Sequence, residues 1–264
     1  MTPLPLASMP EGVRRGVRYV LTDIDDTLTT AGKLTAGAYA SLQRLHEAGK
    51  IVIPVTGRPA GWCDHIARMW PVDAVVGENG AFYMRFDPSR RNLVRRFAAD
   101  VADYDANRAR IATVGARIVD AVRGSALASD QRYRETDLAI DYREDVPALG
   151  PRDVERIVAL MRDEGMTAKV SSIHVNGWFG TYDKLAMTRV LLDEVFGEDI
   201  DAVRDSVLYA GDSPNDAPMF AYFPNAVGVA NVRRFLDRIP AAPAYMTVEE
   251  AGAGFTEIAD ALLG

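Results

Sequence analysis

The most distinctive polar cluster of the sequence is Thr22-Asp23-Ile24-Asp25-Asp26-Thr27-Leu28. It follows Val17–Leu21, a short apolar and β-branched run that predicts a strand. Asp23 and Asp25 therefore stand just beyond the carboxyl end of that strand, at the edge where open α/β sheets bind ligands. A carboxylate can attack phosphorus, and a second carboxyl group can protonate the leaving oxygen and later activate water. The pair suits a two-step phosphoryl hydrolysis.

Asp23-Ile24-Asp25-Asp26-Thr27 resembles the first motif of the haloacid dehalogenase-like superfamily. Segments similar to its other motifs follow in the expected order. Val55-Thr56-Gly57-Arg58 resembles the second motif, Lys184 the third, and Gly211-Asp212-Ser213-Pro214-Asn215-Asp216 the fourth. Each signal is weak alone, but their order and the placement of three of them at predicted strand ends make a strong joint signal. The resemblance covers both flanking thirds and indicates a capped Cof-type or sucrose-phosphatase-like member.

This resemblance implies a role for each residue. Asp23 is expected to be the nucleophile and Asp25 the general acid and base. The residues expected to hold the phosphoryl group or substrate are Thr56, Gly57, Arg58, Lys184 and Asn215. A Mg²⁺ ion, which prefers hard oxygen ligands, is expected on Asp23, Asp25 (through its backbone carbonyl) and Asp212. Asn215 and Asp216 are expected to orient Asp212 and the bound waters.

Each of these roles has an independent physical reason. Phosphoryl transfer concentrates negative charge, which a cation, a lysine and oriented N–H groups can neutralise. Asp26 departs from the family pattern, in which many relatives have glycine, but Asp also tolerates tight turns. For Glu78-Asn79-Gly80 a turn ahead of the inserted segment is favoured over a contact of Asn79 with the site. For His174 a structural role is favoured over a contact from the inserted segment to substrate.

The elements that position these residues alternate in the outer thirds of the chain. Strands are predicted at Val17–Leu21, Ile51–Val55, Ala74–Val76, Val207–Ala210 and Ala226–Val229, with helices between them, which indicates a parallel sheet. The middle third differs: a hairpin at 81–97 is followed by helices and strands in another order. The fold class is therefore α/β, a Rossmann-like parallel core at 1–84 and 180–264 with an inserted α+β cap at 85–179 that selects substrate.

Composition narrows the possible partners. The 264 residues include 30 Lys and Arg against 37 Asp and Glu, a net charge of −7, which disfavours binding to nucleic acid. No apolar run is long enough to span a bilayer, and the N-terminal stretch lacks the apolar block of a secretory signal. The single Cys63 cannot form an internal disulfide. A cytoplasmic monomer or homodimer acting on a small phosphorylated molecule is expected.

Several functions remain open at this level. The leading hypothesis is a Mg²⁺-dependent phosphatase that acts on a sugar phosphate through an aspartyl-phosphate. The alternatives are a hexose phosphate phosphomutase similar to phosphomannomutase, and a non-catalytic metabolite-binding protein. Dehalogenase chemistry is disfavoured because it does not need Asp25. A calcium-binding EF-hand loop is disfavoured because Leu28 and Leu34 stand where it requires glycine and glutamate.

Overall fold

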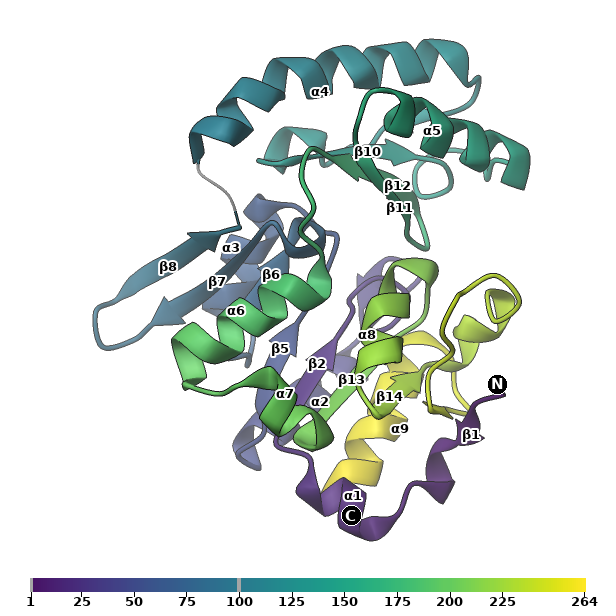
Figure 1. Ribbon diagram of the computed structural model, residues 1–264. Coiled ribbons are helices and arrows are strands. Elements are labelled where there is room, and N and C mark those ends of the chain that lie inside the picture. The colour runs from purple at the N-terminus through teal and green to yellow at the C-terminus, as the bar shows by residue number, and fades with distance from the viewer. Residues whose placement is uncertain (1, 99–100) are drawn as a thin grey trace.

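The computed structural model describes residues 2–98 and 101–264. At its centre lies a six-stranded sheet in the order β1-β15-β14-β13-β2-β5 (Figure 1). Every neighbouring pair in this sheet is parallel, as the predicted alternation requires. The strands are β1 (Leu4–Pro5), β2 (Tyr19–Thr22), β5 (Ile51–Pro54), β13 (Val207–Gly211), β14 (Asn225–Gly228) and β15 (Tyr245–Met246). The α/β fold class is confirmed.

Helices cover both faces of this sheet because successive strand residues alternate between two buried clusters. Val20 belongs to one cluster and Leu21 to the other. The first cluster packs under α1 (Glu11–Gly16), α2 (Ala36–Glu47), α3 (Ala60–Met69) and α9 (Ala251–Leu263). The second packs under α6 (Lys184–Phe196), α7 (Ile200–Val203) and α8 (Ala217–Tyr222). The sheet is therefore buried on both faces, and its strand ends are left for chemistry.

Local signals fix where α6 begins, and this start matters for the site. The side chain of Asp183 accepts a hydrogen bond from the backbone N–H of Ala186 at 2.8 Å and caps the helix. At the other end, Gly197 adopts a left-handed conformation with φ of 67°, which suits glycine. Lys184 is consequently the first residue of the helix, next to the carboxyl edge of the sheet.

A hairpin extends the core beside β5. The strands β7 (Phe82–Asp87) and β8 (Asn92–Phe97) pair antiparallel, as predicted, and β7 also pairs with β6 (Val75–Gly77). A parallel bridge between Val55 and Val76 connects this sheet to the central one. A short hairpin of β3 (Thr29–Thr30) and β4 (Lys33–Leu34) follows the Asp23 segment. The domain boundary expected between 84 and 85 falls within β7.

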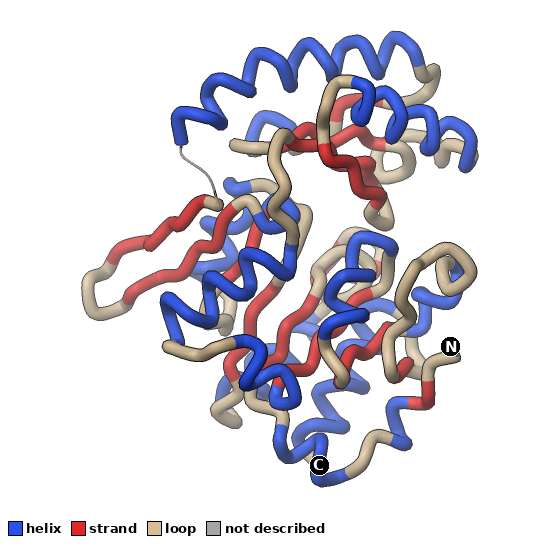
Figure 2. The backbone as a smooth tube through the Cα atoms, viewed as in Figure 1, coloured by secondary structure: helices blue, strands red, loops and turns tan. Residues whose placement is uncertain are grey.

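The segment after the hairpin forms a second unit above the carboxyl edge of the sheet (Figures 1 and 2). Its antiparallel sheet has the order β11-β12-β10-β9, and its apolar core includes Ile118, Leu138 and Ile157. Its elements are α4 (Val101–Ala121), β9 (Ala126–Leu127), β10 (Asp137–Asp141), α5 (Pro151–Asp163), β11 (Thr167–Val170) and β12 (His174–Trp178).

We call this second unit, residues 101–178, the cap, and we propose that it is the substrate-selecting domain expected from the sequence. Its helices α4 and α5 lie on the side of its sheet away from the core (Figure 1). The strands β11 and β12 pair antiparallel, and β12 also pairs antiparallel with β10. Among the residues that the structure describes, no helix is both long and apolar enough to cross a membrane.

Candidate active site

Three of the predicted site segments meet at the carboxyl edge of the central sheet. Asp23 directly follows β2, Asp212 directly follows β13, and Thr56 lies two residues after β5. Since β13, β2 and β5 are neighbours and run parallel, their ends lie side by side. Lys184, at the start of α6, completes the group from a distant part of the sequence. The structure thus brings together the segments that the four motifs predicted.

Lys184 joins the first and fourth motifs. Its Nζ donates to Asp23 Oδ1 and to Asp216 Oδ1, at 2.7 Å in both cases, and all three side chains are buried. Burial alone would lower the pKa of Lys184, but the charges of Asp216 and Asp23 outweigh it and raise this pKa. The lysine therefore stays charged beside the predicted nucleophile.

Asp216 holds the Asp212 loop in shape. Its Oδ2 accepts hydrogen bonds from the backbone N–H of Asp212 at 2.9 Å and of Ser213 at 3.1 Å, while Tyr209 donates its hydroxyl to Oδ1. A Cβ atom on Gly211 would lie only 2.5 Å from the Asp216 carboxylate, so this approach requires glycine. The contacts of Asp216 are consistent with its predicted role of orienting Asp212.

Asp212 offers a free ligand atom. Its Oδ2 accepts from Asn231 Nδ2 at 2.8 Å, whereas its Oδ1 is buried and has no hydrogen-bond partner among the described residues. Burial, reinforced by the charges of Asp216 and Asp23, raises the pKa of Asp212 well above its ordinary value. Burial likewise raises the pKa of Asp23 to about 7, against the opposing charge of Lys184. If all of these carboxyl groups were ionised, the site would carry more negative charge than Lys184 neutralises.

These carboxylates fit a hard divalent cation. One oxygen from each of Asp23, Asp212 and Asp216 lies within 4.8 Å of the others. Magnesium takes oxygen ligands, and an unpartnered buried carboxylate oxygen is the kind of atom it would satisfy. The predicted ligands Asp23 and Asp212 belong to this cluster. We infer no contact between the Asn215 side chain and Asp212, because Asn215 instead accepts from the Ser213 hydroxyl at 2.8 Å and donates to Asn79 at 3.3 Å.

Asn231 was missed by the sequence reasoning, although a signal for it existed. It stands three residues beyond β14, at the same edge of the sheet as the predicted site residues. Besides Asp212, its Nδ2 donates to the backbone oxygen of Asp26 at 2.8 Å and so connects the first and fourth motifs. The signal was its position: like Asp23 and Asp212, Asn231 is a polar residue shortly after a predicted parallel strand.

The second motif forms a tight turn against Asn79. The backbone N–H of Asn79 donates to the Thr56 carbonyl at 3.0 Å, and a Cβ on Gly57 would lie 3.1 Å from the Asn79 amide. Asn79 has a positive φ of 56°, between Glu78 and Gly80, which also have positive φ. Its Nδ2 is buried without a hydrogen-bond partner among the described residues. This amide is therefore an available donor beside the second motif, although a turn rather than a contact was favoured for Asn79.

Arg58 and Asp25 form a separate pair. Arg58 Nε lies 2.9 and 3.0 Å from the two carboxylate oxygens of Asp25. The same guanidinium also contacts two cap residues, Asp130 and Glu144, and Glu144 in turn lies beside His174. Arg58 was predicted to bind phosphate, yet the structure shows its donors occupied by carboxylates. A third cap residue, Arg134, donates to the Gly57 carbonyl. No sequence pattern indicated that Asp130, Arg134 and Glu144 would lie at this site.

The cap closes over the predicted nucleophile. A cavity of about 10 Å³ remains there, which is room for about one water molecule. It is lined by Asp23, Asp25, Gly57, Arg58, Arg134, Ser171, Ile173, His174, Asn176 and Asn215. A larger groove of about 480 Å³ adjoins it beside Asp25, Lys33 and Arg143. The cavity of about 740 Å³ near Tyr133 contains none of the predicted site residues.

Comparison with solved structures identifies the fold of the chain. The trehalose-6-phosphate phosphatase C-terminal domain of C. albicans matches with a TM-score of 0.72 at 15% identity, over 99% of this chain and 98% of that one. A HAD/COF-like hydrolase of Plasmodium vivax matches with a TM-score of 0.66 at 15% identity, over 96% and 98%. The sucrose-phosphatase of Synechocystis matches with a TM-score of 0.61 at 15% identity, over 94% and 98%.

Part of the sequence also matches a family model. Residues 20–103 match the family of haloacid dehalogenase-like hydrolases. We find no match to a curated protein. The chain thus has the fold of these solved structures, and its residues 20–103 carry a sequence match to haloacid dehalogenase-like hydrolases, the family that the order of the four motifs resembles.

Proposed function

We propose that the protein is a Mg²⁺-dependent phosphatase that hydrolyses a small phosphorylated metabolite. The observation that carries this proposal is the convergence of Asp23, Lys184 and Asp212 at one sheet edge, with Lys184 Nζ 2.7 Å from Asp23 Oδ1. A buried carboxylate, a buried ammonium and an unpartnered carboxylate oxygen together supply a nucleophile, a neutralising cation and a metal ligand.

The reaction runs in two displacements. A carboxylate oxygen of Asp23 attacks phosphorus, the bond to the ester oxygen breaks, and Asp25 gives its proton to the departing alcohol. In the second step Asp25 takes a proton from water, the resulting hydroxide oxygen bonds to phosphorus, and the Asp23 carboxylate is released. Lys184 remains protonated and balances charge on the phosphoryl oxygens throughout.

Other residues hold the phosphoryl group and the ion. The Thr56 hydroxyl, the Gly57 backbone N–H and the Asn79 amide would donate to the phosphoryl oxygens. Asp23 and Asp212, with the backbone of Asp25, would hold Mg²⁺, while Asp216 fixes the loop that carries Asp212. When bound, the ion would neutralise charge on the phosphoryl oxygens.

A sugar phosphate is the favoured substrate class. Two of the matched structures are named for trehalose-6-phosphate and sucrose phosphatase activity. The groove of about 480 Å³ beside Asp25 is lined by charged and hydroxyl side chains that include Thr29, Lys33 and Arg143. Such a surface offers donors and acceptors for a polyhydroxylated leaving group.

Phosphate release from a panel of phosphorylated metabolites tests the proposal. The wild-type protein should release phosphate with Mg²⁺ and should stop when the ion is chelated. Asp23→Asn should abolish release, whereas Asp64→Asn, in a half-exposed ion pair with Arg68 on α3, should leave it intact. Full activity of Asp23→Asn would contradict the proposal. Isomerised hexose phosphate without free phosphate would instead favour the phosphomutase alternative.

A further inference from the structure

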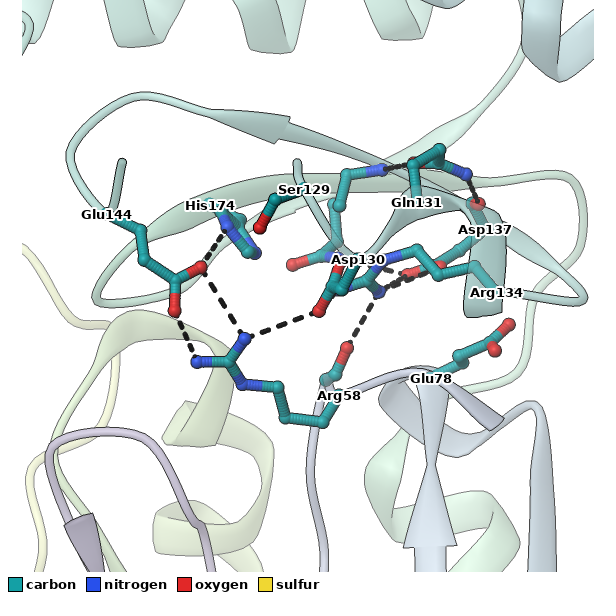
Figure 3. A network of polar contacts seen from close by, with 12 residues as sticks. Arg58, Glu78, Ser129, Asp130, Gln131, Arg134, Asp137, Glu144 and His174 are labelled. Carbon is teal, nitrogen blue, oxygen red and sulfur yellow. Dashed lines mark hydrogen bonds and ion pairs between the residues drawn. The ribbon is translucent and has the colours of Figure 1, made fainter. Parts of the chain in front are cut away.

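One core side chain, Arg58, reaches across the boundary between core and cap. Its Nη2 donates to Glu144 Oε1 at 2.6 Å and its Nη1 lies 3.3 Å from Asp130 Oδ2 (Figure 3). Its Nε and Nη2 lie 2.8–3.0 Å from the Asp25 carboxylate. Only 4% of the Arg58 side chain is exposed. One buried cation thus connects the predicted general acid and base to two carboxylates of the cap.

The contacts of this guanidinium fix its orientation. Its carbon lies 4.5 Å from the centre of the Trp62 ring, a cation–π contact on one face. Asp25 occupies one edge of the planar group and Glu144 another, as the fork geometry of arginine permits. The position of the guanidinium that donates to Asp25 therefore depends on its contact with Glu144 of the cap.

Glu144 is itself held firmly within the cap. Its backbone N–H donates to Asp141 Oδ1 at 2.7 Å, and its Oε2 lies 2.9 Å from His174 Nε2. Burial raises the pKa of Glu144, but hydrogen bonds from His174 and Arg58 lower it to about 2, so the carboxylate is ionised at neutral pH. Both of its oxygens face Arg58: Oε1 accepts from Nη2 at 2.6 Å and Oε2 from Nη1 at 3.5 Å.

The cap must move during turnover. The cavity of about 10 Å³ beside Asp23 cannot admit a phosphate ester. When the cap lifts, Glu144 and Asp130 leave the core with it, and only Asp25 and Trp62 remain beside the guanidinium. A long arginine side chain that loses two partners regains rotational freedom, so its hold on Asp25 loosens.

We propose that Glu144 is a positioning residue that acts through Arg58: in the closed cap it fixes the guanidinium that orients Asp25, so acid–base catalysis is assembled only after closure. This inference rests on the proposed phosphatase function. Through Glu144 the cap contributes to acid–base catalysis without itself contacting the leaving group. Water then meets a correctly oriented Asp25 only while the site is covered.

Glu144→Gln tests the proposal, and Glu135→Gln is its matched control. Glutamine replaces one of the two carboxylate oxygens that accept from Arg58 with an NH₂ group, which cannot accept. Glu135 is also a cap carboxylate paired with a core arginine, Arg95, but this pair is over a third exposed and does not contact Arg58. Turnover, KM and the acid-quenched level of phosphorylated Asp23 are measured for both variants and the wild type.

Glu144→Gln should lower kcat by about 10- to 100-fold, the scale expected for a displaced acid–base group, with KM changed less than about threefold. Phosphorylated Asp23 should accumulate, because its hydrolysis needs Asp25 as base. Glu135→Gln should match the wild type in all three measurements. Wild-type kcat in Glu144→Gln, a raised kcat, or a raised KM with unchanged kcat would each overturn the proposal.

A second measurement separates this inference from the proposed function. Hydrogen exchange needs no substrate, and the backbone of 171–178 should exchange faster in Glu144→Gln than in Glu135→Gln or the wild type. Equal exchange in all three proteins would overturn the link between Glu144 and the closed cap, even in a protein that hydrolyses nothing. If exchange is faster in Glu144→Gln but the wild type releases no phosphate from any substrate tested, the proposed function is wrong. The link between Glu144 and the closed cap would still stand.

Discussion

Lys184 Nζ lies 2.7 Å from Asp23 Oδ1 although 161 residues separate the two in the sequence. The contact joins the segment that follows β2 to α6, the helix that follows the cap. Because Asp216 shares the same ammonium, one lysine balances two buried carboxylates. The site therefore depends on Lys184 for stability as well as for the proposed chemistry.

Lys184→Met should lower both activity and stability. It leaves the buried Asp23 and Asp216 without their cation, and removing one partner of a buried ion pair costs about 3–5 kcal/mol. Urea unfolding without Mg²⁺ measures the free energy, and phosphate release measures the activity. Lys33→Met, at an exposed position in β4, should change the unfolding free energy by less than about 0.5 kcal/mol. Equal stability of the two variants would contradict this account.

Magnesium should stabilise the wild-type protein against heat. Ligand at about 100 times its dissociation constant adds about 2.7 kcal/mol, which raises Tm. Asp212→Asn should lose this shift, since it removes a ligand charge. Without the ion the same variant should melt no lower than the wild type, because burial and two neighbouring carboxylates raise the pKa of Asp212 and disfavour its charge. Calorimetry with and without Mg²⁺ gives both results, and a full shift in Asp212→Asn would exclude this metal site.

Gly57→Ala should impair turnover through the phosphoryl-binding turn. The added Cβ would lie 3.1 Å from the Asn79 amide, tighter than an ordinary contact, and should displace that donor. A loss of about tenfold in kcat/KM is expected for one disturbed donor. Gly12→Ala is the control, because its Cβ meets no atom within 4 Å and alanine favours helix. Unchanged kcat/KM in Gly57→Ala would show that Asn79 adapts freely.

The sequence predicted the core of the site well because its residues follow parallel strands. Asp23 and Asp212 stand directly after β2 and β13, and strand periodicity locates such ends to within a few residues. The short strands β1 and β15 were not predicted, since two residues carry no periodicity. Their pairing depends on the rest of the sheet.

The contacts between core and cap could not be predicted. Asp130, Arg134 and Glu144 lie in turns of the cap, where charged residues are usually solvated. They are half-buried to buried here because the cap sheet lies over the core, and this depends on long-range packing. Arg134, for example, donates to the Gly57 carbonyl at 2.8 Å across that boundary. A local sequence pattern contains no information about such a partner.

The pH dependence of stability should reveal Glu78, which connects the core to the cap. Its carboxylate accepts from the backbone N–H of Ala60 at 2.9 Å, of Glu135 at 3.0 Å and of Thr136 at 2.7 Å. Burial, reinforced by Asp137 and opposed by Arg134, raises the pKa of Glu78 from 4.5 to about 7. Between these values the folded state keeps a proton that the unfolded state has released, so this group lowers stability as pH rises.

Glu78→Gln removes that titration. The free energy of unfolding of the wild type relative to Glu78→Gln should therefore fall by on the order of 2 kcal/mol as pH rises from 5 to 7.5, and then level off. Urea unfolding at several pH values measures this difference, with the partly exposed Glu135→Gln as a control whose difference from the wild type stays constant. A constant difference for Glu78→Gln as well would mean that the Glu78 carboxylate is ionised throughout, held by its three backbone donors despite its burial.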